Sequence, residues 1–310
     1  MARAKEITGL DCAADALLWA AEVLRVRFEE VVNLRGTALN CEDIEGVHSM
    51  RVATRRLRSA LRDFSPLMKK KPLKKVKKDL KQIADALGLA RDQDVAIVAL
   101  EKLQTETDTA QLKSGIEKLI EERRTVRQQA QLGLMETIRI TNIIELQERF
   151  AAATREAVQR KKSARVISFN QAGRNVVATS LKEFLDLSAS LYAPFSIENL
   201  HELRISTKRL RYAIELFVAC WGEKIAPFAK EIAEMQSFLG EVHDSDIWIA
   251  SLGERLRDNT KESEKGEYQT TVWLLSEFVK ERTKNYRAAL KLWSEWKEND
   301  FVGKMRAVIS

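Results

Sequence analysis

The amino-acid sequence predicts an all-α protein that contains an internal duplication. Glycine and proline are scarce, with 12 and 4 residues in a chain of 310, while Ala, Leu, Glu, Lys and Arg are abundant. This composition is typical of helical proteins. Apolar residues recur at steps of three and four along most of the chain, which is the spacing of helices. Two motifs of the first half reappear, in the same order, in the second half.

The duplication is read from two pairs of segments. HSMRVATRRLRSALRDF at His48–Phe64 matches HELRISTKRLRYAIELF at His201–Phe217, with eight of seventeen positions identical and an offset of 153. LGLARDQDV at Leu87–Val95 matches LGEVHDSDI at Leu239–Ile247 with an offset of 152. Two matches that keep their order and register indicate a tandem duplication.

Residues 1–155 and 156–310 are therefore expected to be two similar halves, each an antiparallel four-helix bundle. In the first half the apolar spacing predicts helices at about 11–36, 45–64, 72–88 and 92–130. In the second half it predicts helices at about 166–189, 197–220, 226–240, 244–258 and 267–297, with a connecting helix at about 135–160.

Two glycines and two aspartates are expected to separate helices at equivalent positions of the halves. Gly88 and Gly240 follow the last apolar residue of a helical pattern, where glycine commonly ends a helix. Asp92 and Asp244 come four residues later and suit the N-cap of a following helix. A structural role is therefore predicted for these residues.

The duplicated helix carries basic side chains opposite its apolar face. On a helical wheel the apolar faces hold Met50, Ala53, Leu57, Ala60, Leu61 and Phe64 in the first copy and Leu203, Leu210, Ala213, Ile214 and Phe217 in the second. The opposite faces hold His48, Arg51, Arg55, Arg58 and Arg62 in the first copy and His201, Arg204, Lys208 and Arg211 in the second. We call these two lines of residues the first and second basic stripes.

The first basic stripe points to an anionic ligand. No acid lies between His48 and Arg62, and like charges at helical spacing destabilise a helix unless an anion offsets them. Arginine donates bidentately to phosphate oxygens and stays charged at physiological pH. The stripes are therefore interpreted as a surface for a phosphate-rich polyanion, in preference to a merely solvated charged face.

A lysine-rich helix follows the first stripe. From His48 to Lys81 the chain has thirteen Lys and Arg against two Asp, a net charge of +11, which leaves −4 for the rest because the total is +7. The predicted apolar face of this helix holds Leu73, Val76, Leu80, Ile83 and Leu87, and the opposite face holds Lys71, Lys74, Lys78 and Lys81. The second half contributes Lys230 and more acids, so the first half is expected to bind more strongly.

The remaining polar residues of the repeated motifs predict no catalytic or metal site. Asp94 and Asp246, like Asp92 and Asp244, are assigned a structural role, with the alternative that they pair with and orient Arg56 and Arg209, which lie off the stripes. The chain holds three histidines, two of them beside arginines that repel a divalent cation, so neither a metal nor another cofactor is expected. No phosphate-binding glycine loop or nucleophile motif is present.

The composition also bears on the cellular location of the protein and on the class of its ligand. No signal peptide and no apolar run of about 20 residues is present, and the three cysteines are far apart, which favours a soluble cytoplasmic protein. Nucleic acid ranks below a bare phosphate chain, because of the aromatic residues only Tyr212 lies on a basic face where a base would stack. The oligomeric state is left open.

The sequence resembles the CHAD family of histidine-containing α-helical domains. The family signature His-x-x-Arg-Val-x-x-Arg-Arg-Leu-Arg is matched by His48, Arg51, Val52, Arg55, Arg56, Leu57 and Arg58. The element Leu-Gly-x-x-Arg-Asp-x-Asp-Val is matched from Leu87 to Val95, and the second copies depart from the signatures at Ile205, Lys208 and His243.

This resemblance implies two pseudo-symmetric four-helix bundles whose basic helices line a shared central groove or pore. It also implies binding of inorganic polyphosphate and association with polyphosphate granules. Some relatives carry a fused triphosphate-processing domain of the CYTH type, but its E-x-E-x-K signature is not found here, so a stand-alone, non-enzymatic binding module is expected. The alternatives are an enzyme that processes phosphoanhydrides with a histidine and a nucleic-acid-binding helical scaffold.

Overall fold

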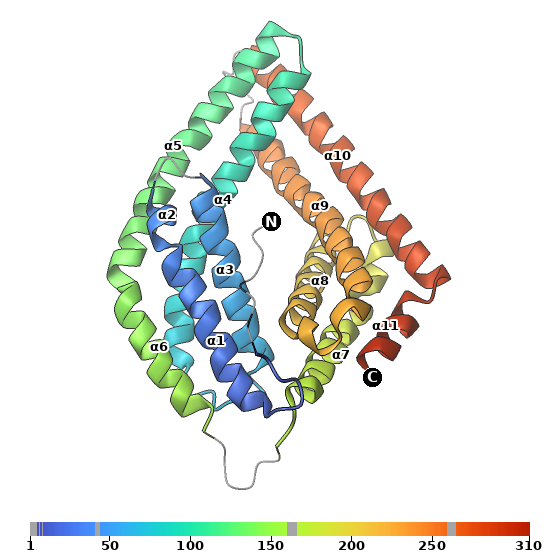
Figure 1. Ribbon diagram of the computed structural model, residues 1–310. Coiled ribbons are helices and arrows are strands. Elements are labelled where there is room, and N and C mark those ends of the chain that lie inside the picture. The colour runs from blue at the N-terminus through green and yellow to red at the C-terminus, as the bar shows by residue number, and fades with distance from the viewer. Residues whose placement is uncertain (1–4, 6, 8, 41–43, 160–165, 259–264) are drawn as a thin grey trace. The chain divides into compact units, whose positions relative to one another are not determined.

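The computed structural model describes residues 5, 7, 9–40, 44–159, 166–258 and 265–310. Within these ranges the regular secondary structure is helical, apart from an isolated β-bridge between Asp15 and Ser168. The chain divides into two compact units: the first is Met1–Asp108 with Ile116–Phe169, and the second is Thr109–Gly115 with Asn170–Ser310. The prediction of an all-α fold is confirmed (Figure 1).

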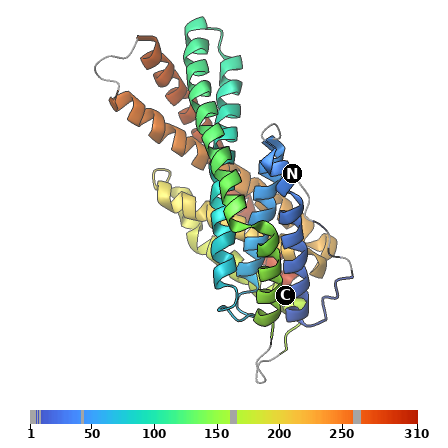
Figure 2. The same cartoon turned by 90° about the vertical axis from the view of Figure 1, so that its left-hand side faces the viewer.

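The first unit is built around the basic helix of the first copy. Its helices are α1 (Ala16–Asn33), α2 (Arg35–Leu39), α3 (Ile44–Asp63), α4 (Lys74–Glu106), α5 (Ala110–Thr141), which belongs to this unit from Ile116 on, and α6 (Ile143–Ala157). Helix α3 packs against α1, α2 and α4, and α6 packs on α1 through the stacked rings of Phe28 and Phe150, 4.4 Å between centroids. Helices α4 and α5 lie side by side as a long antiparallel pair, teal and green in Figure 2.

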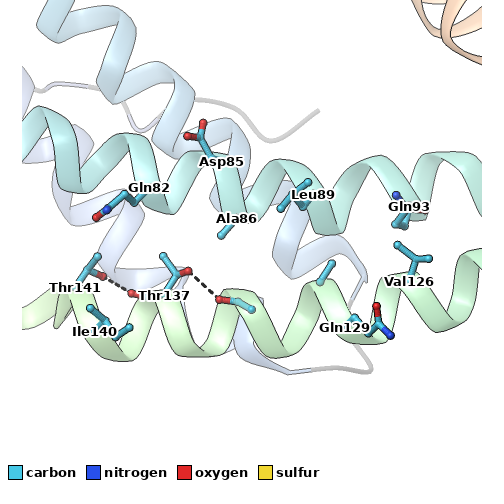
Figure 3. A pocket seen from close by; sticks show the side chains of 12 residues that line it. Gln82, Asp85, Ala86, Leu89, Gln93, Val126, Gln129, Thr137, Ile140 and Thr141 are labelled. Atoms are coloured by element: carbon cyan, nitrogen blue, oxygen red, sulfur yellow. Dashed lines mark hydrogen bonds between the residues drawn. The ribbon is translucent and has the colours of Figure 1, made fainter.

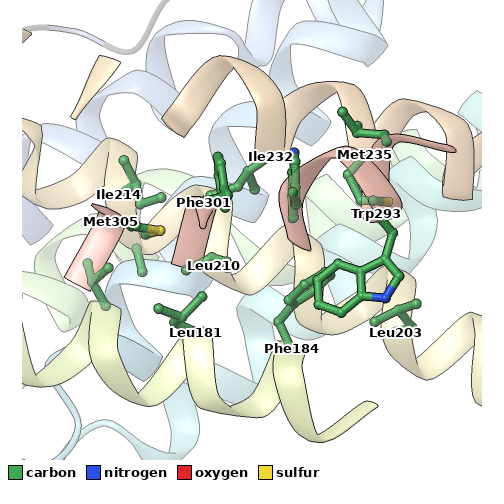
Figure 4. Packing of buried hydrophobic residues seen from close by; sticks show 14 of the residues in the cluster. Leu181, Phe184, Leu203, Leu210, Ile214, Ile232, Met235, Trp293, Phe301 and Met305 are labelled. Carbon is green, nitrogen blue, oxygen red and sulfur yellow. The ribbon is translucent and has the colours of Figure 1, made fainter. Parts of the chain in front are cut away.

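The second unit holds the second basic helix and a large apolar core. Its helices are α7 (Phe169–Leu187), α8 (Ile197–Phe217), α9 (Ala226–Asp258), α10 (Lys265–Glu298) and α11 (Phe301–Ile309), with short 3-10 helices at Ser188–Tyr192, Val218–Cys220 and Gly222–Lys224. Helix α9 packs against both α8 and α10. Phe184, Leu210 and Trp293 are buried together in the core (Figure 4), and Trp296 stacks on Phe301 with 4.1 Å between ring centroids.

The helix ends predicted at Gly88 and Gly240 are wrong. Helix α4 continues through Gly88 and Asp92, and α9 continues through Gly240 and Asp244, so neither glycine ends a helix and neither aspartate caps one. The buried face of α4 explains the continuation, because it runs on from Leu87 to Ala90, Asp94, Ala96 and Leu100. Burial along this face outweighs the cost of about 1 kcal/mol that a glycine imposes inside a helix.

The long helix predicted at 135–160 is divided in two. Helix α5 ends at Thr141 and α6 begins at Ile143, because Asn142 between them has a φ of 41°. A φ in this range is left-handed and interrupts an α-helix, and asparagine tolerates it better than most residues. Helix α1 begins at Ala16, because the side chain of Asp15 accepts a hydrogen bond from the amide of Leu17 at 3.0 Å.

Gly88→Ala is expected to raise the free energy of unfolding by about 0.5–1 kcal/mol. A Cβ built at Gly88 meets no atom within 4 Å, so alanine adds helix propensity without a clash. Urea unfolding measures the change. Gly46→Ala on α3 serves as the contrasting variant, because its Cβ would lie 2.3 Å from the carbonyl oxygen of Thr37, and it should destabilise the protein. A destabilised Gly88→Ala protein would contradict the continuous helix.

Candidate anion-binding surface

The amphipathic division of the duplicated helix is present in both units. Met50, Ala53, Leu57, Ala60, Leu61 and Phe64 of α3 are buried, as are Leu203, Leu210, Ala213, Ile214 and Phe217 of α8. This confirms the predicted apolar faces. On the opposite side of α3, Arg58 is exposed, and the other members of the first stripe are half-buried: His48, Arg51, Arg55 and Arg62.

An aspartate of the neighbouring helix holds the same arginine in each unit. In the first unit Arg51 of α3 donates to Asp92 of α4 at 3.2 Å. In the second, Arg204 of α8 lies 3.6 Å from Asp244 of α9. The two pairs occupy equivalent positions of the duplication. Asp92 and Asp244 therefore orient stripe arginines from within a helix, which replaces the predicted capping role.

Two arginines of the basic stripes form ion pairs that the sequence did not predict. Arg211 was expected on the exposed face of α8, but it is buried, and its Nε donates to Glu215 at 2.8 Å. The prediction of an exposed Arg211 is wrong because Glu215, one turn later, draws the guanidinium along the helix. Arg62, at the end of the first stripe, donates to the buried carboxylate of Asp63 at 2.6 Å. The second stripe thus presents His201, Arg204 and Lys208.

The predicted lysine face of the first unit is exposed to solvent. Leu73, Val76, Leu80, Ile83 and Leu87 are buried, as predicted, while Lys71, Lys74, Lys78 and Lys81 are exposed. Positions 74, 78, 81, 85, 88 and 92 follow one another at steps of three or four residues. Lys74, Lys78 and Lys81 therefore lie on the face of α4 that carries Asp92, the partner of Arg51. Lys230 of the second unit is also exposed. The lysines of α4 thus continue the surface that the first stripe begins.

Lys77 differs from its neighbours. It is half-buried, and its ammonium group donates to the carbonyl of Leu61 at the end of α3, at 3.5 Å. Burial lowers its pKa, and the charge of Lys70 lowers the pKa further. Lys77 thus links α4 to α3 and is not part of the exposed lysine face.

Both acids within the basic segment are already bound to arginines. Asp63 is held by Arg62, and Asp79 accepts a hydrogen bond from Arg149 of α6 at 2.9 Å. In the described ranges of the chain, none of Lys71, Lys74, Lys78 and Lys81 forms an ion pair with a carboxylate. The positive charge of the lysine face is therefore not offset by an ion pair in this part of the chain.

The second aspartates of the repeated motif join their helix to the next one. Asp94 of α4 is buried and accepts a hydrogen bond from Arg127 of α5 at 2.6 Å. Asp246 of α9 accepts one from Arg282 of α10 at 2.5 Å. The alternative pairing with Arg56 and Arg209 is therefore wrong, because Arg127 and Arg282 are the partners of the two aspartates, and Arg209 lies 3.3 Å from Glu183.

The three histidines lie beside positive charges. Burial lowers the pKa of His48, and the nearby guanidinium groups of Arg91, Arg55 and Arg51 lower it further against the opposing effect of Glu45. In the second unit the Nδ1 atoms of His201 and His243 are 3.1 Å apart. Burial, then the charge of Arg204, lowers the pKa of both rings, that of His243 to about 4. In the unliganded protein these rings are therefore neutral near pH 7.

Arg91 and His243 were not among the predicted binding residues. They occupy the same position of the repeated Leu-Gly motif, and each lies against the leading histidine of its stripe, Arg91 beside His48 and His243 beside His201. Aligning the two copies of the motif could have identified them, because this position holds an arginine in one copy and a histidine in the other.

A pocket of about 620 Å³ lies between α4 and α5, and no lysine, arginine or histidine is among the described residues that line it. Figure 3 shows that it is lined by apolar, amide and hydroxyl side chains such as Leu89, Gln93 and Thr137. The hydroxyl of Thr137 donates to Gly133 of its own helix, and Asp85 is the charged lining residue. This lining does not suit a phosphate group.

Two further findings concern metals and membranes. Among the described residues, no group of three or more His, Cys, Asp or Glu side chains is placed to hold a metal ion. None of the helices in the described ranges combines the length and the apolar character needed to cross a bilayer.

The model of the CHAD domain family matches residues 22–253, which is well over half of the chain. The chain belongs to the CHAD domain family.

The fold is similar to that of the CHAD domain from the plant Ricinus communis, with a TM-score of 0.69 and 21% sequence identity over 93% of this chain and 96% of that one. PptA from Streptomyces chartreusis is also similar, with a TM-score of 0.71 and 14% identity over 91% of this chain and 100% of that one. No curated protein sequence matches. The motif resemblance is confirmed at the level of the family.

Proposed function

We propose that this CHAD protein binds inorganic polyphosphate without catalysing its turnover. The observation that carries the proposal is the surface of the first unit, where the basic stripe of α3 meets the lysine face of α4 while Asp63 and Asp79 are bound to arginines. A chain of phosphates offers one anionic group after another, which suits cations spaced by about one helical turn, 5.4 Å.

The two units contribute unequally in this proposal. The first unit offers Arg51, Arg55 and Arg58 together with the lysines, whereas in the second unit Arg211 is buried against Glu215. His201, Arg204, Lys208 and the exposed Lys230 form a smaller cationic set. The first unit therefore supplies most of the affinity, and the second adds contacts to a chain that is already bound.

A titration of the whole chain with long-chain polyphosphate, at salt concentrations from 50 to about 200 mM, tests the proposal. We expect log K to fall linearly with log salt concentration, because each phosphate contact releases a counterion. Duplex DNA and single-stranded DNA serve as competitors. Preference for either nucleic acid, or an affinity that does not respond to salt, would contradict the proposal. Release of orthophosphate from the bound polymer would instead support the alternative of a histidine-dependent phosphoanhydride enzyme.

We also place the protein at polyphosphate granules in the cell. This follows from binding, since a protein with several low-affinity contacts accumulates where the polymer is concentrated. A fluorescent fusion should collect at granules and disperse when polyphosphate synthesis is blocked. A fusion that keeps the same distribution without polyphosphate would contradict granule association while leaving binding itself intact.

A further inference from the structure

We propose that His201 and His243 form a proton-uptake site, so that the second unit binds polyphosphate more tightly as the pH falls. This inference rests on the proposed function and deepens it, because it names how the same site is regulated. The geometry that carries it is the approach of the two imidazole rings across α8 and α9: the Nδ1 atoms are 3.1 Å apart and the ring centroids 4.3 Å apart.

The short contact between the rings limits the protons that the free protein carries. An N–H···N hydrogen bond needs one ring to donate through Nδ1 and the other to accept through an unprotonated Nδ1. If both rings were protonated, two N–H groups and two positive charges would face each other at 3.1 Å. The pair therefore accepts a first proton at one ring and resists a second one.

The charges around the pair oppose protonation in the absence of a ligand. From α8 the rings face Arg204 and Lys208, whose charges lower the pKa of both histidines, while Glu202 raises that of His201. From α9, Asp244 lies against Arg204 at 3.6 Å. Helix α10, which packs on α9, holds Arg282, whose charge is balanced by Asp246 at 2.5 Å. Of these charges, those of Arg204 and Lys208 each affect the pKa of His201 more than that of Glu202 does, so the surroundings disfavour a protonated ring.

A bound polyphosphate favours protonation of the histidine pair. Phosphate oxygens that contact Arg204 and Lys208 offset the charges that oppose protonation, and they also accept hydrogen bonds from an imidazolium. The pKa of the pair is thus low in the free protein and higher in the complex. Binding then takes up protons, and affinity rises as the pH falls through the pKa of the complex toward the free value of about 4 for His243. Above the pKa of the complex the effect is absent.

The first unit provides an internal comparison. At the position of His243 it carries Arg91, whose charge acts on His48. Arginine is a fixed cation, whereas histidine titrates near physiological pH. The duplicated site therefore has a fixed cation in one copy and a pair of coupled titratable rings in the other. His48 titrates alone, while His201 and His243 titrate together.

His243→Arg tests the inference, because it gives the second unit the residue that the first unit has. Calorimetric titrations of the full chain with long-chain inorganic polyphosphate, at pH 5.5 to 7.5 and in two buffers of different ionisation enthalpy, count the protons taken up. The wild-type chain should take up more protons than His243→Arg, and its affinity should rise more steeply as the pH falls, by up to about tenfold per pH unit for each additional proton. Equal uptake by both proteins overturns the inference.

A reciprocal variant and a spectroscopic measurement keep the test independent of one substitution. Arg91→His creates a second histidine pair with His48, and proton uptake should increase. NMR titration of the wild-type imidazole rings should show both pKa values of the pair rising when polyphosphate binds. Unchanged ring pKa values in the complex overturn proton uptake, even if His243→Arg fails to fold. Absence of polyphosphate binding at every pH would overturn the proposed function itself, which separates the two failures.

Discussion

Replacing Lys74 and Lys78 together by glutamate is expected to weaken polyphosphate binding by about 100-fold or more, since each lost charge-assisted contact is worth about 1.5–3 kcal/mol. Both side chains are exposed on α4 and form no ion pair in the described part of the chain, so their loss should act on the ligand and not on the fold. Isothermal titration at two salt concentrations measures the affinity. The slope of log K against log salt should also decrease by about 1 for each lost contact.

The matched control is a pair of charge reversals of the same size elsewhere. Lys102 and Lys291 are exposed, each beside a glutamate four residues later on its own helix, and neither belongs to the proposed site. Lys102→Glu with Lys291→Glu changes the net charge by the same amount, so it isolates the position of the charge from its total. Equal loss of affinity in the two double variants would show that overall charge, and not the surface of α3 and α4, attracts the polymer.

Asp246→Ala is expected to lower the free energy of unfolding of the second unit by about 3–5 kcal/mol. Arg282 is mostly buried, with 13% of its side chain exposed, and loses its carboxylate partner in this variant. An uncompensated buried charge is costly because water cannot solvate it fully. Urea unfolding followed by tryptophan fluorescence measures the effect, since five of the six tryptophans lie after residue 220 in the sequence.

Two further variants test whether the unpaired charge of buried Arg282 causes the destabilisation. Asp186→Ala removes an exposed carboxylate that pairs with Lys182 at 2.5 Å, and it should change stability by no more than about 1 kcal/mol. Asp246→Leu combined with Arg282→Met replaces the pair by apolar side chains and should recover much of the stability lost in Asp246→Ala. If Asp246→Ala lowers the free energy of unfolding by less than about 1 kcal/mol, the ion pair between Asp246 and Arg282 contributes little to the stability of the second unit.

Helix type and helix face could be predicted from the sequence because both follow from local periodicity. The residues that the helical wheels placed on the apolar faces of α3, α8 and the first part of α4 are all buried, although Arg211 and Tyr212 of α8, which were predicted on a basic face, are buried as well. The ends of α4 and α9 could not be predicted in the same way. Gly88 and Gly240 look like helix ends locally, and only the burial of residues beyond them keeps the helices continuous.

The partners of charged side chains were the least predictable part of the site. Arg51 and Asp92 are far apart in the sequence, and so are Asp94 and Arg127, so their pairing depends on how α3, α4 and α5 pack. The burial of Arg211 was also missed, although Glu215 one turn later was a local signal for it. The histidine pair required the positions of α8 and α9, because His201 and His243 are 42 residues apart. The shared groove that the family resemblance implies stays a prediction.

The aspartates that hold Arg51 and Arg204 bear on which anions the protein accepts. In the proposed function each carboxylate would compete with an incoming phosphate for the N–H donors of its arginine. A lone orthophosphate makes this exchange with few compensating contacts. A polymer makes it while its other phosphates are already held by the neighbouring lysines, so the effective concentration of each displacing group is high. If the protein binds polyphosphate as proposed, we expect this competition to favour long phosphate chains over short ones, although no side chain measures length directly.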